Sequence, residues 1–353
     1  MVLIGMLHHR KHPQKIKKSL AYVAIASAEG AKLLYFTPKA VDFKRKRIFG
    51  YIYRNGSWKK KRSRFPDVIY NAGSPIKLER SIEVIEKLKE KIPFTTHSIG
   101  NKMRVYKRLT QHQKFQKFLI PSEYIYSVRA FLSYLRIYQK IVFKPVDGHK
   151  GEGIAFIEQI REEYRVLIGT KASMYSRSQL IEFVSSKLKE ERHLVQPYIN
   201  CKTKSGSSYD FRIHMQKNGN GEWVLLTTYP RIGAQGSIVA NISSGGATNY
   251  LIPFLKQEFD EEYYNIKGYL EQFGLQLARH MDEIQDIHFN ETIDELGIDV
   301  ALDDMNRIWV FEVNWRPGCP PIFYLEMDVV KNSINYAIHL AKKKSIRKKI
   351  NKE

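Results

Sequence analysis

The sequence predicts a small α/β domain with a partly parallel sheet over residues 1–95. A larger α+β region over residues 96–345 follows it, with a short basic tail at 346–353. Apolar segments alternate with amphipathic ones in the first region, which is typical of strands that alternate with helices. Long strand-like segments joined by Asn-Gly turns mark the second region, and such turns favour antiparallel hairpins. A chain of 353 residues is long enough for two or three domains.

The elements of the first region follow from its apolar pattern. Residues 2–7 are an apolar run typical of a buried strand, and apolar residues recur at helical spacing from Gln14 until Gly30 ends the helix. Asn55-Gly56 lies between two strand-like segments and is a strong hairpin signal. The order is Rossmann-like, but no GxGxxG motif follows the first strand, so no dinucleotide site is predicted. The predicted strands are 2–7, 32–36, 47–53, 57–61 and 67–71, and the predicted helices are 14–29 and 76–91.

The second region begins with a helix and then alternates strands, hairpins and helices. Asn218-Gly219 separates two long strands, and a further hairpin turns near Met305. Apolar residues at helical spacing from Tyr263 to Met281 predict a long amphipathic helix. The predicted helices are 101–118, 178–189, 263–281 and one from 322 onward, and the predicted strands are 140–146, 193–199, 210–216, 222–229, 297–302 and 307–314.

Composition excludes several classes of protein. With 43% hydrophobic and 12% aromatic residues, the chain is not largely disordered. No apolar run approaches the ~18 residues that a transmembrane helix needs, so no membrane span is expected. Cys201 and Cys319 are too few and too far apart for a disulfide framework or a zinc site, which favours a cytoplasmic location.

Much of the formal charge of +22 is concentrated in two segments. Residues 44–64 contain ten basic residues and no acidic one, interleaved with aromatic residues, and the tail from Lys342 to Lys352 is also basic. The hairpin 44–64 and the tail could bind nucleic acid or another polyanion. A solvated hairpin surface and a frayed helical tail are the alternative explanation.

The most informative segment is residues 297–318, which predicts a metal site on a hairpin. Glu312 and Asn314 share one face of the second strand, because side chains alternate with a period of two. A turn near Met305 places Asp299 opposite Glu312. Two opposed carboxylates inside an apolar hairpin are destabilising unless a cation lies between them. Mg²⁺, with Mn²⁺ as a possible substitute, meets that need and would be shared with nucleotide phosphates. The alternative is an exposed strand face with unrelated polar residues.

A second segment, residues 140–156, combines a lysine with a glycine-bearing loop. Lys144 ends a strand, and Gly148, Gly151 and Gly153 follow it. Small residues let backbone N–H groups approach phosphate oxygens, and the lysine supplies a point charge. By itself this pattern is equally consistent with a surface loop.

Several other polar residues are informative only when they are considered together. The strand 193–199 carries Gln196 and could hold a base by backbone hydrogen bonds. Asp210 and Arg212 share a face of the next strand, and Arg212 could bind phosphate with two parallel hydrogen bonds. Arg231 and Asn241 lie on a long polar segment after Tyr229. A surface salt bridge is the alternative role for each arginine.

Taken in order, these residues resemble the ATP-grasp superfamily. The spacing Asp-x₁₂-Glu-x-Asn over 299–314, followed by Pro-Gly, is similar to the magnesium motif of that superfamily. The strings YDFRIHMQKNGNGEW and RIGAQGSIVANISSGGA resemble the YheC/YheD-type endospore coat-associated proteins. The resemblance covers about residues 96–345 and implies a two-lobed ATP-grasp fold, with lobes at about 125–200 and 201–340. The resemblance also implies that residues 1–95 are the domain that usually precedes the grasp in that superfamily.

The resemblance also implies roles for individual residues. It implies ATP and Mg²⁺ as cofactors, held between the two lobes. In this assignment Lys102 and Lys144 contact the phosphates of ATP, and Gly148, Gly151 and Gly153 form a loop that closes over them. Gln196 and Ile199 line the adenine pocket, and Arg212 and Arg231 bind phosphate or the substrate carboxylate. Asn241 supports the γ-phosphate region, and Mg²⁺ is bound by Asp299, Glu312 and Asn314. The chain departs from the pattern at 200–208, where the usual ribose-binding acid is missing, and at His149 and Lys150, where many relatives have small residues.

The function that these features predict is an ATP-dependent ligase. It would join a small-molecule or peptide carboxylate to an amine or thiol acceptor through an acylphosphate, in the cytoplasm or at the spore coat. Two alternatives stay open. One is a spore structural protein that binds nucleotide without turnover and docks to a polyanionic partner. The other is a nucleic-acid-binding protein with no enzymatic role, which predicts steeply salt-dependent binding.

Overall fold

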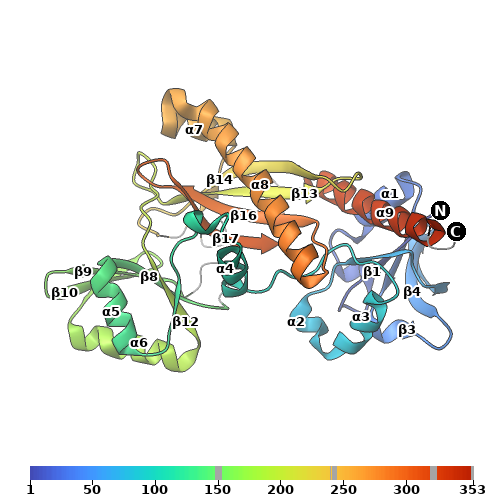
Figure 1. Cartoon of the computed structure of the whole chain (residues 1–353), viewed down its shortest axis with the longest axis horizontal. Helices are drawn as coiled ribbons and strands as arrows, with labels where there is room; N and C mark the ends of the chain where they lie inside the picture. Colours follow the sequence, from blue (N-terminus) through green and yellow to red (C-terminus); the bar gives the residue numbers. More distant parts are fainter. Residues whose placement is uncertain (148–152, 239, 241–244, 319–323, 351–353) are drawn as a thin grey trace.

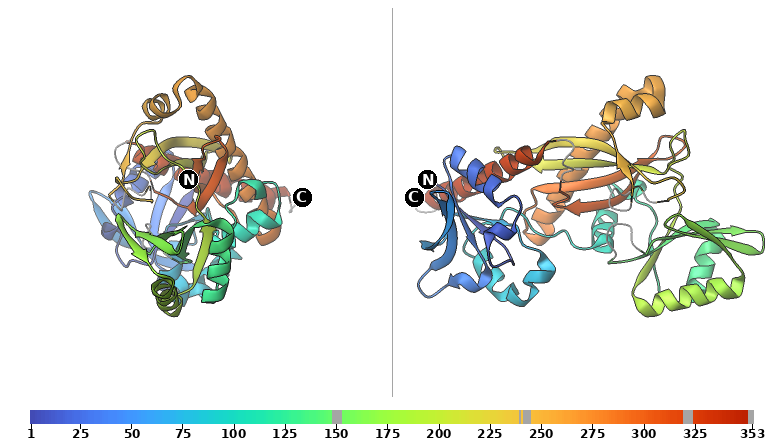
Figure 2. Two further views of the ribbon diagram at one scale, coloured as in Figure 1. Left: turned by 90° about the vertical axis from the view of Figure 1, so that its left-hand side faces the viewer. Right: turned by 180° about the vertical axis from the view of Figure 1, so that it is seen from behind.

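The computed structural model describes residues 1–147, 153–238, 240, 245–318 and 324–350. Its strands form three sheets that follow one another along the long axis of the molecule (Figures 1 and 2). The sheet at the N-terminus is partly parallel and the other two are antiparallel, so the predicted change from an α/β to an α+β arrangement is confirmed.

The first sheet has the order β3-β4-β2-β1-β6, with β5 paired to β4. Strand β1 is central and pairs in parallel with β2 on one side and with β6 on the other. The Asn55-Gly56 hairpin is confirmed, since β4 and β5 pair along their whole length. The strands are β1 (Leu3–Leu7), β2 (Lys32–Phe36), β3 (Val41–Asp42), β4 (Arg47–Arg54), β5 (Ser57–Arg64) and β6 (Val68–Asn71).

Helices cover both faces of the first sheet. On one face, α1 (Ser19–Ala28) and the last helix, α9 (Glu326–Ile350), share a core with β1, β2 and β6. On the other face, α2 (Pro75–Leu78), a 3₁₀ turn and α3 (Ile82–Lys89) replace the single helix predicted over 76–91. Helix α1 starts later than predicted, because a 3₁₀ turn at Pro13–Lys15 precedes it.

The position of α9 is the main surprise of the fold. Its buried residues Val330, Ile334 and Ala337 pack with Ile4 and Met6 of β1, far away in sequence. The same helix contacts β13 of the third sheet. The predicted boundary gives most of α9 to the second lobe, yet it joins that lobe to the N-terminal sheet.

The second sheet has the order β11-β10-β9-β8-β12-β7 and is covered on one face by two helices. Sequence analysis found β8, β12 and α6 but missed the meander β9–β11 and helix α5. The strands are β7 (Glu123–Ile125), β8 (Lys140–Pro145), β9 (Ala155–Ile160), β10 (Glu163–Ile168), β11 (Lys171–Tyr175) and β12 (His193–Pro197), and the helices are α5 (Val128–Tyr138) and α6 (Arg177–Glu190).

The third sheet lies between the other two and has the order β15-β14-β13-β16-β17. Both predicted hairpins are confirmed, and the long helix α8 packs across β13 and β14. The buried core of this part is the largest apolar cluster of the molecule's described residues. The strands are β13 (Tyr209–Lys217), β14 (Trp223–Ile232), β15 (Ala247–Thr248), β16 (Glu295–Leu302) and β17 (Ile308–Trp315), and the helices are α7 (Leu251–Phe259) and α8 (Tyr263–Phe289).

One short helix connects the sheets. Helix α4 (Lys102–Gln111) contacts β17 and ends seven residues before the predicted end at Phe118. The cause is local: Gln113 has a φ of 50°, outside the range of a right-handed helix, and the chain resumes as a 3₁₀ turn at Gln116–Phe118. No helix in the described residues is long and apolar enough to cross a bilayer.

Candidate functional site

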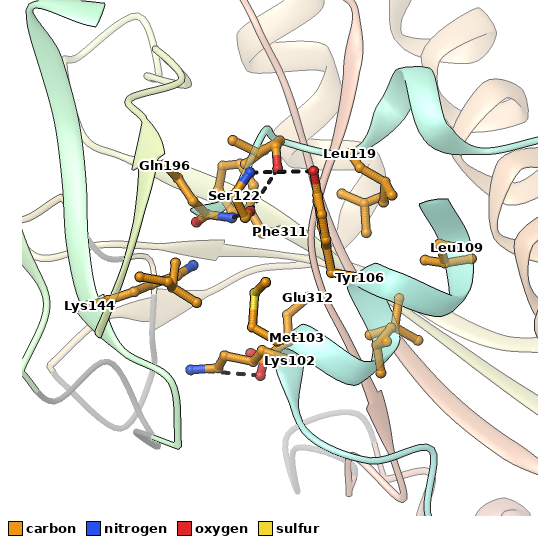
Figure 3. Close-up of a pocket in the computed structure, with 15 residues that line it drawn as sticks. Lys102, Met103, Tyr106, Leu109, Leu119, Ser122, Lys144, Gln196, Phe311 and Glu312 are labelled. Carbon is orange, nitrogen blue, oxygen red and sulfur yellow. Dashed lines mark hydrogen bonds and ion pairs between the residues drawn. The ribbon is translucent and has the colours of Figure 1, made fainter. Parts of the chain in front are cut away.

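A pocket lies where α4, the β8–β12 pair and β17 meet (Figure 3). The space within it, including the part open to solvent, is about 450 Å³. Its walls combine apolar side chains with a few polar ones, as small-molecule pockets commonly do. The polar lining side chains are Lys102, Tyr106, Ser122, Lys144, Gln196 and Glu312.

Lys102 is the first residue of α4 and faces the carboxylate of β17. Its Nζ lies 4.0 Å from Oε1 of Glu312, and 24% and 31% of the two side chains are exposed. The helix start is fixed by Asn101, whose side chain accepts a hydrogen bond from the backbone N–H of Arg104. The amide of Asn101 also donates to Asp147, which ties α4 to the end of the β8 segment.

Lys144 approaches the same pocket from β8. The pKa of its amine is lowered to about 8, first by burial and then by the positive charge of Lys102, while Glu312 acts in the opposite direction. Two amines and one carboxylate therefore share a small, partly dehydrated space. An anion that entered between the amines would raise the pKa of Lys144 again and favour its charged form further.

Gln196 lies on β12 at the far side of the pocket and is held by a hydrogen-bond chain. Its Nε2 donates to Oγ of Ser122 at 2.6 Å, and that hydroxyl donates to the carbonyl of Ile120 at 2.8 Å. The backbone N–H of Ser122 reaches the hydroxyl of Tyr106 at 3.4 Å. Because each of these groups has a partner, the orientation of the Gln196 amide is fixed.

The predicted alignment of the acidic residues is present in the third sheet. Asp299 of β16 pairs in register with Glu312 of β17 on one side and with Arg212 of β13 on the other. Cross-strand partners share a face of a sheet, so the three side chains form one row. Asn314 lies on the same face two residues after Glu312, and its Nδ2 is 3.5 Å from Oδ2 of Asp299.

Asp299 is neutralised by two arginines, which corrects the reasoning that a cation must separate it from Glu312. Arg212 donates from Nε and Nη2 to the two oxygens of Asp299, and Nη2 of Arg231 lies 2.9 Å from Oδ2. Arg231 also donates two hydrogen bonds to Asp210, at 2.6 and 2.7 Å. All four side chains are at least 88% buried. Burial raises the pKa of Asp299, but the two arginines outweigh it and hold the pKa below its usual value.

The remaining donors suit a hard cation that is shared with phosphates. Glu312 and Asn314 offer carboxylate and amide oxygens on one face, while Oδ1 of Asp299 accepts a hydrogen bond from Arg212 and from no other described residue. In the described part of the chain, no three His, Cys, Asp or Glu side chains gather as a metal site. Mg²⁺ is commonly held by one or two carboxylates together with substrate phosphates, so the donor set fits that mode of binding.

Comparison with known proteins identifies the family of this chain. Residues 91–340 match the family model described as YheC/D like ATP-grasp. The chain belongs to the YheC/D-like ATP-grasp family. Both the fold class and the family resemblance predicted from the sequence are thereby confirmed.

Two curated relatives of this ATP-grasp chain come from Bacillus subtilis (strain 168). Endospore coat-associated protein YheD is 24% identical over 339 residues, which cover 91% of this chain and 73% of that protein. Endospore coat-associated protein YheC is 23% identical over 330 residues, which cover 90% of this chain and 89% of that protein.

Solved structures show the same ATP-grasp fold at low sequence identity. The RimK domain protein ATP-grasp from Sphaerobacter thermophilus has a TM-score of 0.55 at 10% identity and covers 95% of this chain and 99% of its own. The D-alanine–D-alanine ligase from Bacillus anthracis, solved with ATP, has a TM-score of 0.54 at 12% identity and covers 99% of both chains. At these identities the likeness concerns the fold alone.

The structure brings some of the predicted site residues together and separates others. Lys102, Lys144, Gln196 and Glu312 line the pocket, whereas Ile199 packs against the apolar core of the third sheet. The predicted residues Arg212, Arg231, Asp299 and Asn314 form the adjoining polar row, and Gly148, Gly151 and Asn241 lie outside the described residues.

Gly153 lies directly after the undescribed part of the glycine-bearing loop, and its position demands glycine. Its φ is 72°, and a Cβ atom there would be 2.8 Å from Cγ of Pro145. The left-handed backbone and the close proline ring together exclude a side chain. At Gly153 the chain therefore passes close to the end of β8 before it enters β9.

Sequence reasoning missed most residues of the pocket wall, among them Met103, Tyr106, Ser122 and Phe311. Tyr106 had a usable signal, because it lies four residues after Lys102 on one helix face. Ser122 had none, since its role depends on where the chain after α4 meets β12.

Proposed function

We propose that this chain is an ATP- and Mg²⁺-dependent ligase that joins a carboxylate to an amine or thiol through an acylphosphate. Membership of the ATP-grasp family and the ligase neighbours support ATP-dependent ligase activity in general. The observation that carries the finer proposal is the pocket in which Lys102, Lys144 and Glu312 converge from three different elements.

The residues of this pocket suit each part of the proposed reaction. Lys102 and Lys144 supply positive charge for the phosphates, and the fixed amide of Gln196 lines the region proposed for the base. Glu312 and Asn314 would hold Mg²⁺, which neutralises charge on the transferring phosphoryl group when it is bound. Asp299 would act mainly through its arginine partners, which keep the row of polar residues in place.

The reaction needs no nucleophilic side chain. A carboxylate oxygen of the substrate forms a bond to the γ-phosphorus of ATP, and the bond from that phosphorus to the β,γ-bridging oxygen breaks, so that ADP leaves. The amine or thiol then attacks the acyl carbon, inorganic phosphate leaves, and the proton of the nucleophile passes to solvent or phosphate. Positioning and charge neutralisation supply the catalysis.

The proposal is tested with purified full-length protein, ATP, Mg²⁺ and a panel of carboxylic acids. Hydroxylamine serves as the acceptor, because it converts an acylphosphate into a stable hydroxamate. We expect ADP release and hydroxamate with at least one acid. Lys144→Gln should lose both, and Lys171→Gln, an exposed lysine on β11, should keep both. ATP binding without ADP release under any condition would contradict the ligase and favour the nucleotide-binding structural protein.

The location at the spore coat is a proposal that rests on the names of the two relatives. In the structure, Lys59, Lys60, Lys61 and Arg62 of β5 are exposed, as a basic docking surface requires. A polyanionic partner for the hairpin 44–64 and the tail stays a prediction. Salt-dependent pull-down on immobilised polyanions, compared between the intact chain and a Lys59→Gln, Lys61→Gln variant, tests it.

A further inference from the structure

The carboxyl end of β1 carries an unusual group of basic side chains. His8, His9 and Arg10 follow the last residue of that strand. Strand β2 pairs with one edge of β1 and β6 pairs with the other, so the strand order reverses at β1. In α/β sheets, ligands bind at the carboxyl ends of strands where the strand order reverses.

The electrostatic surroundings of these residues are strongly cationic. The pKa of His8 is lowered to about 4, first by burial and then by the neighbouring groups His9, Arg10, Arg316 and Lys77. The pKa of His9 is also lowered, first by burial and then by Lys77, Arg10 and Arg316. The two imidazole rings lie 4.2 Å apart, so they share these surroundings. Both rings are therefore neutral at pH 7 in the absence of an anion.

The hydrogen bonds of the two rings leave donors directed away from the backbone. Nδ1 of His8 accepts from the backbone N–H of Arg10 at 2.9 Å, and Nδ1 of His9 accepts from that of Ser74 at 3.2 Å. In each neutral ring the proton is therefore on Nε2. Nε2 of His9 is buried and has no partner among the described residues. A buried donor without a partner is unfavourable and is commonly explained by a missing ligand or water.

Arg316 connects this group to the ATP-grasp pocket. It follows β17 directly and donates from Nη1 and Nη2 to the carbonyls of Asn71 and Gly73, both at 2.7 Å. Its φ of 48° is unfavourable for a residue with a side chain, so the contact holds the backbone in a strained turn. Arg316 is the fourth residue after Glu312, so their Cα atoms are at most about 14 Å apart. One small molecule, or the end of one peptide, can reach both places.

We propose that His8, His9, Arg10, Lys77 and Arg316 form a subsite for an anionic group of the ligase substrate. The substrate class is then an acid with at least two carboxylates, such as the end of an acidic peptide. One carboxylate is phosphorylated near Lys102 and Lys144, and another binds at the carboxyl end of β1. This inference rests on the proposed function for the first carboxylate only, since the second can bind without ATP.

The test is a calorimetric titration of the full-length protein with triglutamate in the absence of ATP, with triglutamine of the same length as the uncharged probe. We expect binding of triglutamate alone. Lys77→Gln, which changes an exposed residue, should weaken it about two- to fivefold. His9→Gln should weaken it about tenfold or more, because a hydrogen bond to a charged group is lost. Lys87→Gln, an exposed lysine on α3, should leave the affinity unchanged.

Three results would overturn the subsite. The first is no binding of triglutamate, the second is equal binding of triglutamine, and the third is equal weakening by Lys87→Gln and Lys77→Gln. Inorganic phosphate that binds with the same dependence on Lys77 while triglutamate does not would overturn the assignment to a carboxylate. The two proposals can fail independently. Binding of triglutamate without any ADP release would support the subsite and contradict the ligase activity. ADP release with monocarboxylic acids, without binding of triglutamate, would support the ligase activity and contradict the subsite.

Discussion

The replacement Glu312→Gln tests the proposed metal site with little disturbance of the fold. Glutamine keeps the volume and hydrogen-bonding capacity of the side chain but removes one negative charge from β17. Because Glu312 is 31% exposed and its cationic neighbour Lys102 is 4.0 Å away, the lost ion pair is worth at most about 1 kcal/mol. Relief of repulsion with Asp299 adds little, since Arg212 and Arg231 already neutralise that carboxylate. The melting temperature should therefore change by no more than about 2–4 °C.

The effect on nucleotide chemistry should be much larger. Calorimetry of ATP binding is performed with Mg²⁺ and again with the metal chelated. In the wild-type protein Mg²⁺ should strengthen binding, and in Glu312→Gln most of this gain should be lost. ADP release should fall at least about a hundredfold, as when a preorganised group that stabilises the transition-state charge is removed. Glu261→Gln, an exposed residue outside the site, is the control. Unfolding of Glu312→Gln, or an unchanged gain from Mg²⁺, would refute the assignment.

Three further predictions concern stability. Arg212→Gln breaks a buried ion pair and should lower the free energy of unfolding, measured in urea, by about 3–5 kcal/mol. An unchanged urea midpoint would mean that the pair does not form. Burial and a neighbouring glutamate raise the pKa of Asp294 to about 7, so the folded state binds an extra proton between about pH 4 and 7 and stability falls as pH rises through that window. Asp294→Asn should abolish this fall in stability and raise the free energy of unfolding by roughly 2–4 kcal/mol at pH 8. If the free energy of unfolding depends on pH in the same way in both proteins, this prediction is wrong. Gly153→Ala should cost more than Gly169→Ala, which has a φ of 61° but open space around it, so equal losses would argue against the contact with the proline ring.

The features that sequence could predict are those that depend on short-range pattern. The alternation of side chains and the short turn between β16 and β17 place Asp299 opposite Glu312, and the structure has that register. Helix α8 was predicted because its apolar stripe at Ile266, Leu270 and Phe273 is long and regular. The strands β9–β11 were missed, since β11 is almost entirely exposed and shows no apolar alternation.

The features that sequence could not predict depend on which elements meet. Nothing near Arg212 or Arg231 shows that both guanidinium groups will bind Asp299, because that choice requires β16, from a different hairpin, to pair with β13. The apolar positions Val330 and Ile334 show that α9 has a buried face, but they do not show that β1 covers it. The same limit applies to Arg316, whose carbonyl partners are Asn71 at the end of β6 and Gly73 just after it.

The pairing of the arginines has a consequence for how a metal would enter the site. Arg212, Arg231, Asp210 and Asp299 carry charges that sum to zero, so Asp299 offers little attraction to a free cation. The pocket beyond them contains Glu312 and two amines, of which Lys102 lies nearest to the carboxylate. A divalent cation alone would meet as much repulsion as attraction there. The phosphates of ATP reverse that balance, because they neutralise the amines and supply further oxygen ligands. Mg²⁺ should therefore bind as a complex with ATP, which is why its contribution must be measured with the nucleotide present.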